Sequence, residues 1–185
     1  MTKEVLMPIA DGFEEIEAVT VIDILRRAGA KVTVAALSGE KVIGAHGITM
    51  YADDTIAKAT DKLFDLVALA GGAGNANALS GDRQTLEIVK KHYEQGRLVA
   101  AICASPIALA AAGVIHGEFT CFGGCEKGIN AKYVDQKVVE NGNVITSQGA
   151  GTAYEFALAL TARLFGRVSA DTIGKETYFY ARNAQ

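Results

Sequence analysis

The sequence predicts an α/β fold in which helices cover both faces of a doubly wound, mostly parallel sheet. Short continuous apolar runs alternate along the chain with segments of helical spacing. Such runs are typical of strands buried on both faces, and their alternation with helices favours a parallel sheet. The chain has 185 residues, of which 50% are hydrophobic, so it can fill a sizeable core. We therefore expect a single domain over residues 1–185.

The predicted sheet starts with a strand, a helix and a second strand. Residues 4–10 have the pattern of a buried strand, and a turn signal separates them from a helix that Glu14 opens. The helical pattern ends near Arg27, just before a glycine. The run 32–37 predicts the second strand, and residues 42–51 predict a small antiparallel excursion.

The rest of the chain continues this alternation. The predicted elements are a strand at 66–70, a helix at 82–95, a strand at 97–102, a helix at 107–112, a hairpin at 137–147, and a helix that follows a cap at 149–152 and ends near Phe165. Ligands of such sheets bind where strand-to-helix loops meet at the carboxyl ends of the strands. Three of these loops carry suggestive residues, namely 11–17, 71–74 and 103–104.

Cys103 lies at the predicted corner between a strand and a helix. A side chain on such a sharp turn is held at the edge of the sheet, and the amides that open the helix favour a thiolate. The G-x-S-x-G form of a nucleophile elbow is absent. The alternative is a small buried hydrophobe, because free cysteine is among the most buried residue types. Cys103 is therefore a candidate nucleophile.

The run Gly71-Gly72-Ala73-Gly74 follows the strand at 66–70. The G-x-G-x-x-G spacing of a dinucleotide loop is missing, which argues against a nucleotide site. A glycine pair lets backbone amides approach a reacting atom, so Gly72 and the amide of Ala104 could form an oxyanion hole. The alternative is a tight turn with no further role.

Three carboxylates, Glu14, Glu15 and Glu17, open the first predicted helix, where negative charge complements the helix dipole. Glu14 and Glu17 are spaced to share one face, so one of them could point toward the strand ends. A partly desolvated Glu17 would have a raised pKa and could exchange a proton with Cys103 as a general acid or base.

The histidines and the other cysteines give weaker signals. His92 lies among charged residues and is expected to be solvated, and His46 and His116 lie in an excursion and a loop. We expect structural roles for all three. Cys121 and Cys125 have C-x-x-x-C spacing, but no second ligand pair accompanies them, so no metal site is predicted.

Composition narrows the possible partners and location. The net charge is −3 and no basic run with interleaved aromatics occurs, which argues against a nucleic-acid platform. No apolar run is long enough to cross a membrane, and the first residues lack a signal-peptide pattern. An odd number of cysteines without an export signal fits reduced thiols. We expect a cytoplasmic protein.

Four motifs resemble one known family over nearly the whole chain. They are Asp11-Gly12-Phe13-Glu14-Glu15-Ile16-Glu17, Ala70-Gly71-Gly72, Ala100-Ala101-Ile102-Cys103-Ala104 and Thr146-Ser147-Gln148-Gly149-Ala150-Gly151-Thr152. In this order they are similar to the ThiJ/PfpI family, within it to the branch of the deglycase associated with Parkinson disease. The resemblance implies a flavodoxin-like fold, related to that of class I glutamine amidotransferases, and a homodimer. It also implies Cys103 as the reactive cysteine and Glu17 as the carboxyl group bonded to it.

The resemblance also implies activities. Members of this branch convert methylglyoxal and glyoxal to hydroxy acids without a cofactor, repair early glycation adducts, and show chaperone behaviour. Their cysteine oxidises to a sulfinate that the same glutamate stabilises. Ala104 stands where the protease-like branch has histidine, which argues against peptidase activity, and Cys121-Phe122 stands where some members have a loop histidine. Gln148 stands where human-type members have an arginine, which weakens anion binding near the expected dimer interface.

Two functions therefore remain open on the sequence. The first is a cysteine-dependent enzyme that acts on small dicarbonyls or their adducts, in which Cys103 attacks the aldehyde and Glu17 moves the proton. These residues require no cofactor. The second is an oxidative-stress protein in which Cys103 is a redox sensor and turnover is incidental.

Overall fold

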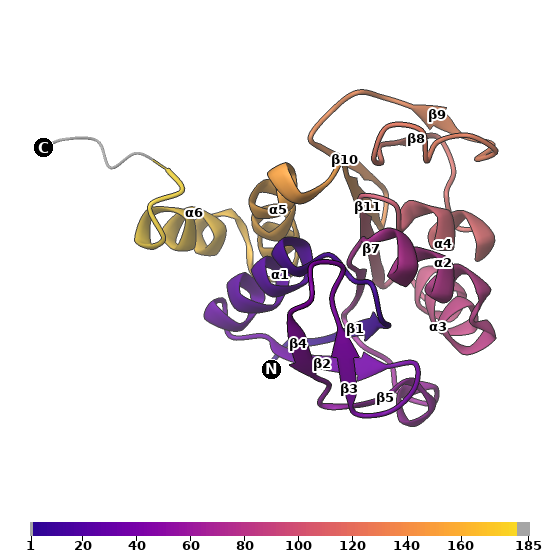
Figure 1. The fold of residues 1–185 in the computed structure, drawn as a ribbon. Helices are drawn as coiled ribbons and strands as arrows, with labels where there is room; N and C mark the ends of the chain where they lie inside the picture. Colours follow the sequence, from indigo (N-terminus) through magenta and orange to yellow (C-terminus); the bar gives the residue numbers. More distant parts are fainter. Residues whose placement is uncertain (1, 181–185) are drawn as a thin grey trace, which may run out of the picture.

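A seven-stranded sheet forms the centre of the computed structural model, which describes residues 2–180 (Figure 1). Its spatial order is β10-β11-β7-β6-β1-β2-β5, and every neighbouring pair is parallel except the hairpin β10–β11. The strands are β1 (Glu4–Ile9), β2 (Lys31–Ala36), β5 (Asp54–Thr55), β6 (Leu66–Leu69), β7 (Leu98–Ile102), β10 (Val138–Asn141) and β11 (Val144–Ser147). The predicted mostly parallel sheet is confirmed.

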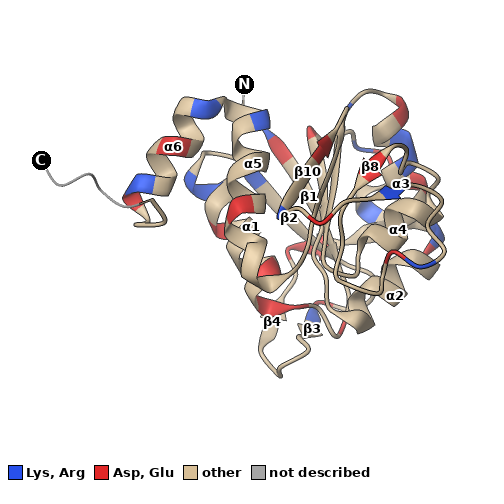
Figure 2. Cartoon of the chain, turned by 90° about the horizontal axis from the view of Figure 1, so that it is seen from above, with Lys and Arg blue, Asp and Glu red and all other residues tan. Residues whose placement is uncertain are grey.

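Helices cover both faces of this sheet, as the alternating pattern predicts (Figure 2). One face carries α1 (Glu15–Arg27), α5 (Ala153–Phe165) and α6 (Arg167–Glu176), and the other carries α2 (Ala73–Gly81), α3 (Arg83–Glu94) and α4 (Pro106–Ala111). Two separate hydrophobic clusters fill the two sheet–helix layers. The fold is thus a three-layer α/β sandwich of the flavodoxin-like type.

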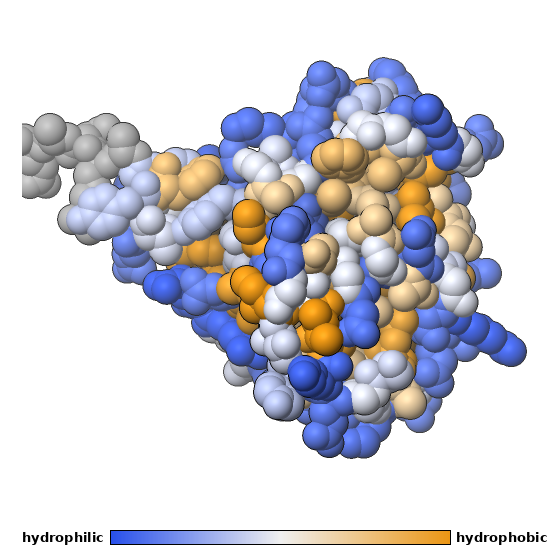
Figure 3. Space-filling view, viewed as in Figure 1, coloured by the Kyte–Doolittle hydropathy of each residue, from blue (hydrophilic) through white to orange (hydrophobic). Residues whose placement is uncertain are grey.

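The predicted excursion after β2 is a small hairpin. Strands β3 (Lys41–Ile43) and β4 (Thr49–Tyr51) pair antiparallel and lie apart from the main sheet. Hydrophobic residues gather on the surface over α1 and this hairpin (Figure 3). We name this surface the hairpin patch, and its exposed side chains are Ile16, Val19, Ile43, Ile48 and Tyr51.

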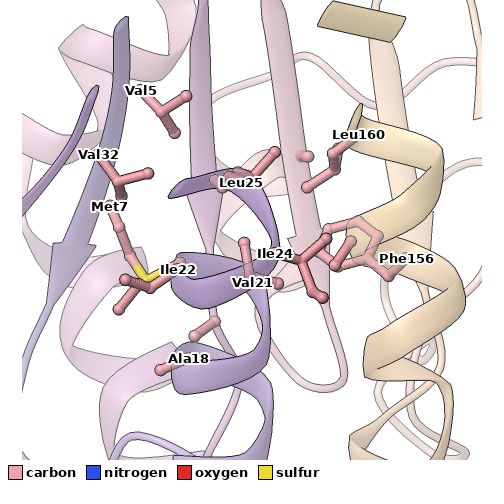
Figure 4. Close-up of a cluster of buried hydrophobic side chains, with 14 of the residues drawn as sticks. Val5, Met7, Ala18, Val21, Ile22, Ile24, Leu25, Val32, Phe156 and Leu160 are labelled. Atoms are coloured by element: carbon pink, nitrogen blue, oxygen red, sulfur yellow. The ribbon is translucent and has the colours of Figure 1, made fainter. Parts of the chain in front are cut away.

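The larger core cluster explains how α1 is held (Figure 4). Val21, Leu25 and their neighbours on one face of α1 are buried against Met7 of β1 and Phe156 of α5. This packing holds α1 in one position on the sheet, so the first turn of α1 lies above the carboxyl end of β1. Glu17 lies in that first turn.

Several short elements have no clear pattern in the sequence. They are α2, α6, β5, the parallel pair β8 (Glu118–Phe119) and β9 (Lys132–Tyr133), and the 3-10 turn at Ile56–Ala59. The sequence of α2, AGNANALSG, contains glycine, asparagine and serine, which disfavour helices in isolation. Tertiary packing decides the conformation of this segment.

The prediction that His92 is solvated is wrong. His92 is fully buried, its Nδ1 lies 2.7 Å from the carbonyl oxygen of Ile88, and its Nε2 accepts the amide of Phe64 at 2.9 Å. The charged neighbours in the sequence lie on other faces of α3, whereas Thr85, Ile88 and Val89 share the buried face with His92. Burial lowers the pKa of His92.

None of the helices described in residues 2–180 combines the length and apolar character needed to span a bilayer.

Candidate active site

Cys103 occupies the predicted corner and its backbone is strained. Its φ of 66° lies in the left-handed region, which costs a residue with a side chain on the order of 1 kcal/mol. Hydrogen bonds hold this conformation from both sides. The Cys103 amide donates to Ser147 O at 3.0 Å, and Cys103 O accepts the Phe122 amide at 2.8 Å. The end of β11 and the loop after β8 therefore clamp the corner between β7 and α4.

Glu17 is the carboxyl group that the fold brings to Cys103. It is fully buried, and its Oε2 accepts the amide of Gly71 at 2.7 Å. Its Oε1 is also buried and finds no hydrogen-bond partner among residues 2–180. Burial raises the pKa of Glu17 to about 7, against hydrogen bonds from Gly71 and Cys103 that lower it, with a smaller increase from the charge of Glu14. Glu17 can therefore hold or release a proton near neutral pH.

The Cys103 thiol shares this environment. Burial first, and then the negative charge of Glu17, raise the pKa of Cys103 to about 12, while the amides of Gly72 and Ala104 donate to the sulfur and lower it. The two amides thus lower the pKa of the Cys103 thiol, as expected for groups that stabilise a thiolate. Burial and the charge of Glu17 raise the same pKa by more. Protonation of Glu17 removes the repulsion between the two charges, so it makes a Cys103 thiolate less unfavourable, although burial still opposes it.

The two glycines after β6 allow this close approach. A β-carbon on Gly71 would overlap Glu17 Oε2 and would lie 2.5 Å from Cys103 Cβ. Gly72 has a φ of 87°, and a β-carbon there would lie 2.6 Å from the amide nitrogen of Glu14. Both features require glycine. The loop therefore places the Gly72 amide against the Cys103 sulfur.

Two buried polar side chains, which sequence reasoning missed, hold the same loop. Asn75 Oδ1 accepts the amide of Ala10 at 2.8 Å, and Asn75 Nδ2 donates to Ala70 O at 2.7 Å. Ser105 Oγ donates to Ala70 O at 2.5 Å. The only available signal was their position close to the ends of predicted strands, which does not distinguish them from ordinary polar loop residues.

The other two carboxylates at the start of α1 have different partners. Glu14 caps the helix, since its Oε1 accepts the amide of Ile16 at 2.9 Å. Glu15 holds the turn of the hairpin by accepting the His46 amide at 2.7 Å and lying 2.9 Å from His46 Nδ1. Within residues 2–180, Glu14, Glu15 and His46 are also the one group of donors close enough to share a metal ion. Of the three glutamates, Glu17 alone interacts with Cys103.

The remaining candidates lie away from this pair. His116 packs its ring 6.0 Å from that of Tyr93. Cys121 is buried, Cys125 is half-buried, and both are free thiols. Neither belongs to a donor group within the described part of the chain, so the C-x-x-x-C spacing does not assemble a metal site there.

Comparison with known proteins assigns the chain to a family. Residues 3–163 match the model of the DJ-1/PfpI family. The chain belongs to this family. The family resemblance that the motifs carry is thereby confirmed.

Individual relatives support the same assignment. The chain is 40% identical over 180 residues to Protein dj-1beta of Drosophila melanogaster, covering 95% of this chain and 96% of the relative. It is 36% identical over 165 residues to the Caenorhabditis elegans protein named glutathione-independent glyoxalase DJR-1.2, covering 88% of both. It is 38% identical over 180 residues to Protein DJ-1 homolog B of Arabidopsis thaliana, covering 95% of this chain but only 41% of that relative's length.

Solved structures confirm the fold. The crystal structure of Drosophila melanogaster DJ-1beta superposes with a TM-score of 0.93 at 38% identity, covering 98% of this chain and all of that one. The structure of oxidized Toxoplasma gondii DJ-1 superposes with a TM-score of 0.91 at 33% identity, covering 98% of this chain and all of that one.

Proposed function

We propose that this DJ-1/PfpI family protein is a cofactor-independent enzyme that converts small dicarbonyls such as methylglyoxal and glyoxal to hydroxy acids. The observation that carries the proposal is the pairing of a strained Cys103 with a buried Glu17 whose pKa is raised to about 7. A nucleophile beside a proton carrier whose pKa lies near neutrality is what an internal oxidation–reduction of a dicarbonyl requires. The glyoxalase name of the Caenorhabditis elegans relative supports the same reaction class.

The first step joins Cys103 to the substrate. With the shared proton on Glu17, the Cys103 thiolate attacks the aldehyde carbon and a C–S bond forms while the C=O double bond opens to an oxyanion. Glu17 gives its proton to that oxygen, which yields a hemithioacetal. The amides of Gly72 and Ala104, which point at the sulfur, lie close to the developing oxyanion and stabilise it.

The second step moves a proton between the two substrate carbons. The Glu17 carboxylate removes the proton from the carbon bonded to sulfur, and the resulting enediol is protonated at the neighbouring carbon. The former aldehyde carbon is oxidised to a thioester and the ketone carbon is reduced to an alcohol, so no outside oxidant is needed. Water then cleaves the thioester, which releases the hydroxy acid and restores the Cys103 thiol.

Early glycation adducts are a second substrate class for the same chemistry. Such an adduct carries a carbinol carbon next to a carbonyl group, as the hemithioacetal does. Cys103 therefore forms a C–S bond to the carbinol carbon while the C–N bond breaks, and the thiol proton leaves with the amine; the steps above then follow unchanged. We propose this deglycase activity as an extension of the dicarbonyl reaction.

The test is the rate of methylglyoxal loss, with lactate identified as the product, in protein whose Cys103 is confirmed reduced. We expect Cys103→Ala to abolish turnover, and Cys125→Ala, which removes a half-buried thiol outside the site, to retain it. Consumption of a single equivalent of methylglyoxal by the wild-type protein would show that Cys103 is merely a reactive thiol and would contradict the proposal.

A redox-sensor function is the second candidate, and one contact favours it. A protonated Glu17 beside the sulfur could donate a hydrogen bond to a Cys103 sulfinate. The oxidized state of the related Toxoplasma gondii DJ-1 structure supports this reading. If two equivalents of hydrogen peroxide per thiol convert Cys103 to sulfinate while Cys121 and Cys125 stay reduced, and dicarbonyl turnover is absent, the sensor function replaces the enzyme.

The family resemblance implies a homodimer, and we also propose that the second copy of the chain covers the hairpin patch. The patch extends from α1 to the β3–β4 hairpin and exposes five large hydrophobic side chains. Single exposed hydrophobic residues are common on protein surfaces, but a group of this size is typical of an interaction site. Sedimentation should show a dimer for the wild-type protein and a monomer for Val19→Asp. Val168→Asp, at an exposed position on α6, is the matched control and should remain a dimer.

A further inference from the structure

Phe122 is a large apolar side chain that the structure leaves exposed next to the candidate active site. Its side chain is 57% exposed. The other exposed large hydrophobic residues within 2–180 lie in the hairpin patch or on and after α6. Phe122 therefore belongs to neither group and needs an explanation at its own position.

The backbone of Phe122 is fixed against the reactive corner. Its amide donates to Cys103 O at 2.8 Å, and its carbonyl oxygen accepts the amide of Cys125 at 2.9 Å. Both backbone groups are thus engaged, one by the strained residue itself and one by the turn that follows. The ring is carried on a rigid support rather than on a free loop.

The edge of the Phe122 ring and the unpaired oxygen of Glu17 both lie beside Gly149. A β-carbon on Gly149 would lie 3.5 Å from Phe122 Cδ2 and 4.0 Å from Glu17 Oε1. The bare face of Gly149 thus separates the edge of the ring from the carboxyl oxygen that has no hydrogen-bond partner among the described residues. A substrate joined to the half-buried Cys103, whose carbonyl oxygen accepts the Phe122 amide, would bring its substituents toward this ring.

We propose that Phe122 is a specificity-determining residue, which forms an apolar wall of the Cys103 site and favours dicarbonyls that carry a small alkyl group over those that carry none. This inference rests on the proposed function and names the substrate class within it. The ring offers no hydrogen bond, so it discriminates by contact with apolar carbon.

The expected size of the effect follows from the substrate. Methylglyoxal differs from glyoxal by one methyl group. Contact of this methyl group with the half-exposed Phe122 ring should raise kcat/KM for methylglyoxal relative to glyoxal by about fivefold. The effect should appear mainly in KM, because the methyl group contacts the ring equally in the ground state and the transition state.

The experiment compares kcat/KM for methylglyoxal and for glyoxal in the wild-type protein, Phe122→Ala and Phe122→Leu. We expect Phe122→Ala to lower the methylglyoxal-to-glyoxal ratio about fivefold, and Phe122→Leu, which keeps an apolar wall, to retain most of it. Val168→Ala, which shortens an exposed apolar side chain on α6, should leave the ratio unchanged. A ratio that stays constant while both rates fall in Phe122→Ala would overturn the inference, although the enzyme function would stand.

A second measurement does not depend on turnover. The rates at which maleimide and N-ethylmaleimide alkylate Cys103 are compared by mass spectrometry after cleavage at Glu118, which separates Cys103 from Cys121 and Cys125. If Phe122 is an apolar wall, Phe122→Ala lowers the preference for the N-ethyl reagent severalfold, even in a protein that turns over neither dicarbonyl. An unchanged preference would contradict the inference independently of the proposed function.

Discussion

Gly71 donates its amide hydrogen to Glu17 Oε2 at 2.7 Å. It has no β-carbon, and a β-carbon at this position would collide with both Glu17 and Cys103. One glycine thus both binds the buried carboxyl group and permits its approach to the thiol. This contact joins the end of β6 to the first turn of α1 and the end of β7.

Replacing this glycine should therefore harm the site directly. We expect Gly71→Ala to destabilise the fold by about 1–3 kcal/mol through overpacking and to lower kcat/KM by more than about tenfold by separating Glu17 from Cys103. Gly81→Ala is the matched control, because a β-carbon at that helical position meets no atom within 4 Å. Urea unfolding and methylglyoxal turnover measure the two effects, and equal behaviour of the two variants would show that the packing at Gly71 is unimportant.

Glu17 should make the stability of the protein depend on pH. Between the ordinary pKa of 4.5 and the raised value of about 7, the folded state keeps a proton that the unfolded state has lost. The contribution of Glu17 to stability therefore falls as pH rises through this window and is lowest above pH 7.

Glu17→Gln removes this titration while it keeps the shape of the side chain. We expect the variant to gain stability relative to the wild-type protein as the pH rises from about 4.5 to 7, with a total gain on the order of 1–3 kcal/mol. At the same time its dicarbonyl turnover should fall at least about a hundredfold, because it cannot carry a proton. Denaturant unfolding at several pH values tests the first statement, and a constant difference between the two proteins would refute it.

His92 should make the protein less stable as the pH falls, which is the opposite of the effect of Glu17. Burial lowers its folded pKa below the ordinary value of 6.5, so below that value the unfolded state binds a proton that the folded state excludes. Stability from His92 is therefore complete above about pH 6.5 and is lost as pH falls. We expect His92→Gln, which can still accept the Phe64 amide, to weaken the fall in stability between pH 7.5 and 5. A fall in stability as steep in His92→Gln as in the wild-type protein would contradict this role of His92.

Asn75 should be required for the geometry of the glycine loop. In Asn75→Asp, a carboxylate replaces the amide group that donates to Ala70 O, and two oxygens then face each other in a buried place. We expect a loss of stability of about 2–3 kcal/mol and a fall in turnover. Asn77→Asp, on the exposed face of the same helix, introduces the same charge and should be close to neutral in both assays. Similar losses in the two variants would point to charge rather than to the hydrogen bonds of Asn75.

The main elements of the fold could be predicted because each of them is encoded locally. The residues of β1, β6 and β7 are almost all apolar, so their composition alone predicts buried strands. The Asn141-Gly142 pair is typical of a tight turn and predicts the hairpin around it. By contrast α2 and α6 lack a strong local pattern, so their helical conformation depends on packing. His92 was misjudged for the same reason, because charged sequence neighbours do not reveal which helix face meets the core.

By itself, the sequence determined the order of strands and helices, the strand-to-helix corner at Cys103 and the glycines that follow β6. The family resemblance already named Glu17 as the carboxyl group bonded to Cys103. Only the tertiary structure showed the burial and raised pKa of Glu17, the different partners of Glu14 and Glu15, and the position of Phe122. The physical reason is that local conformation depends on residues near in sequence, whereas burial and pKa depend on groups that the sheet brings together from distant segments.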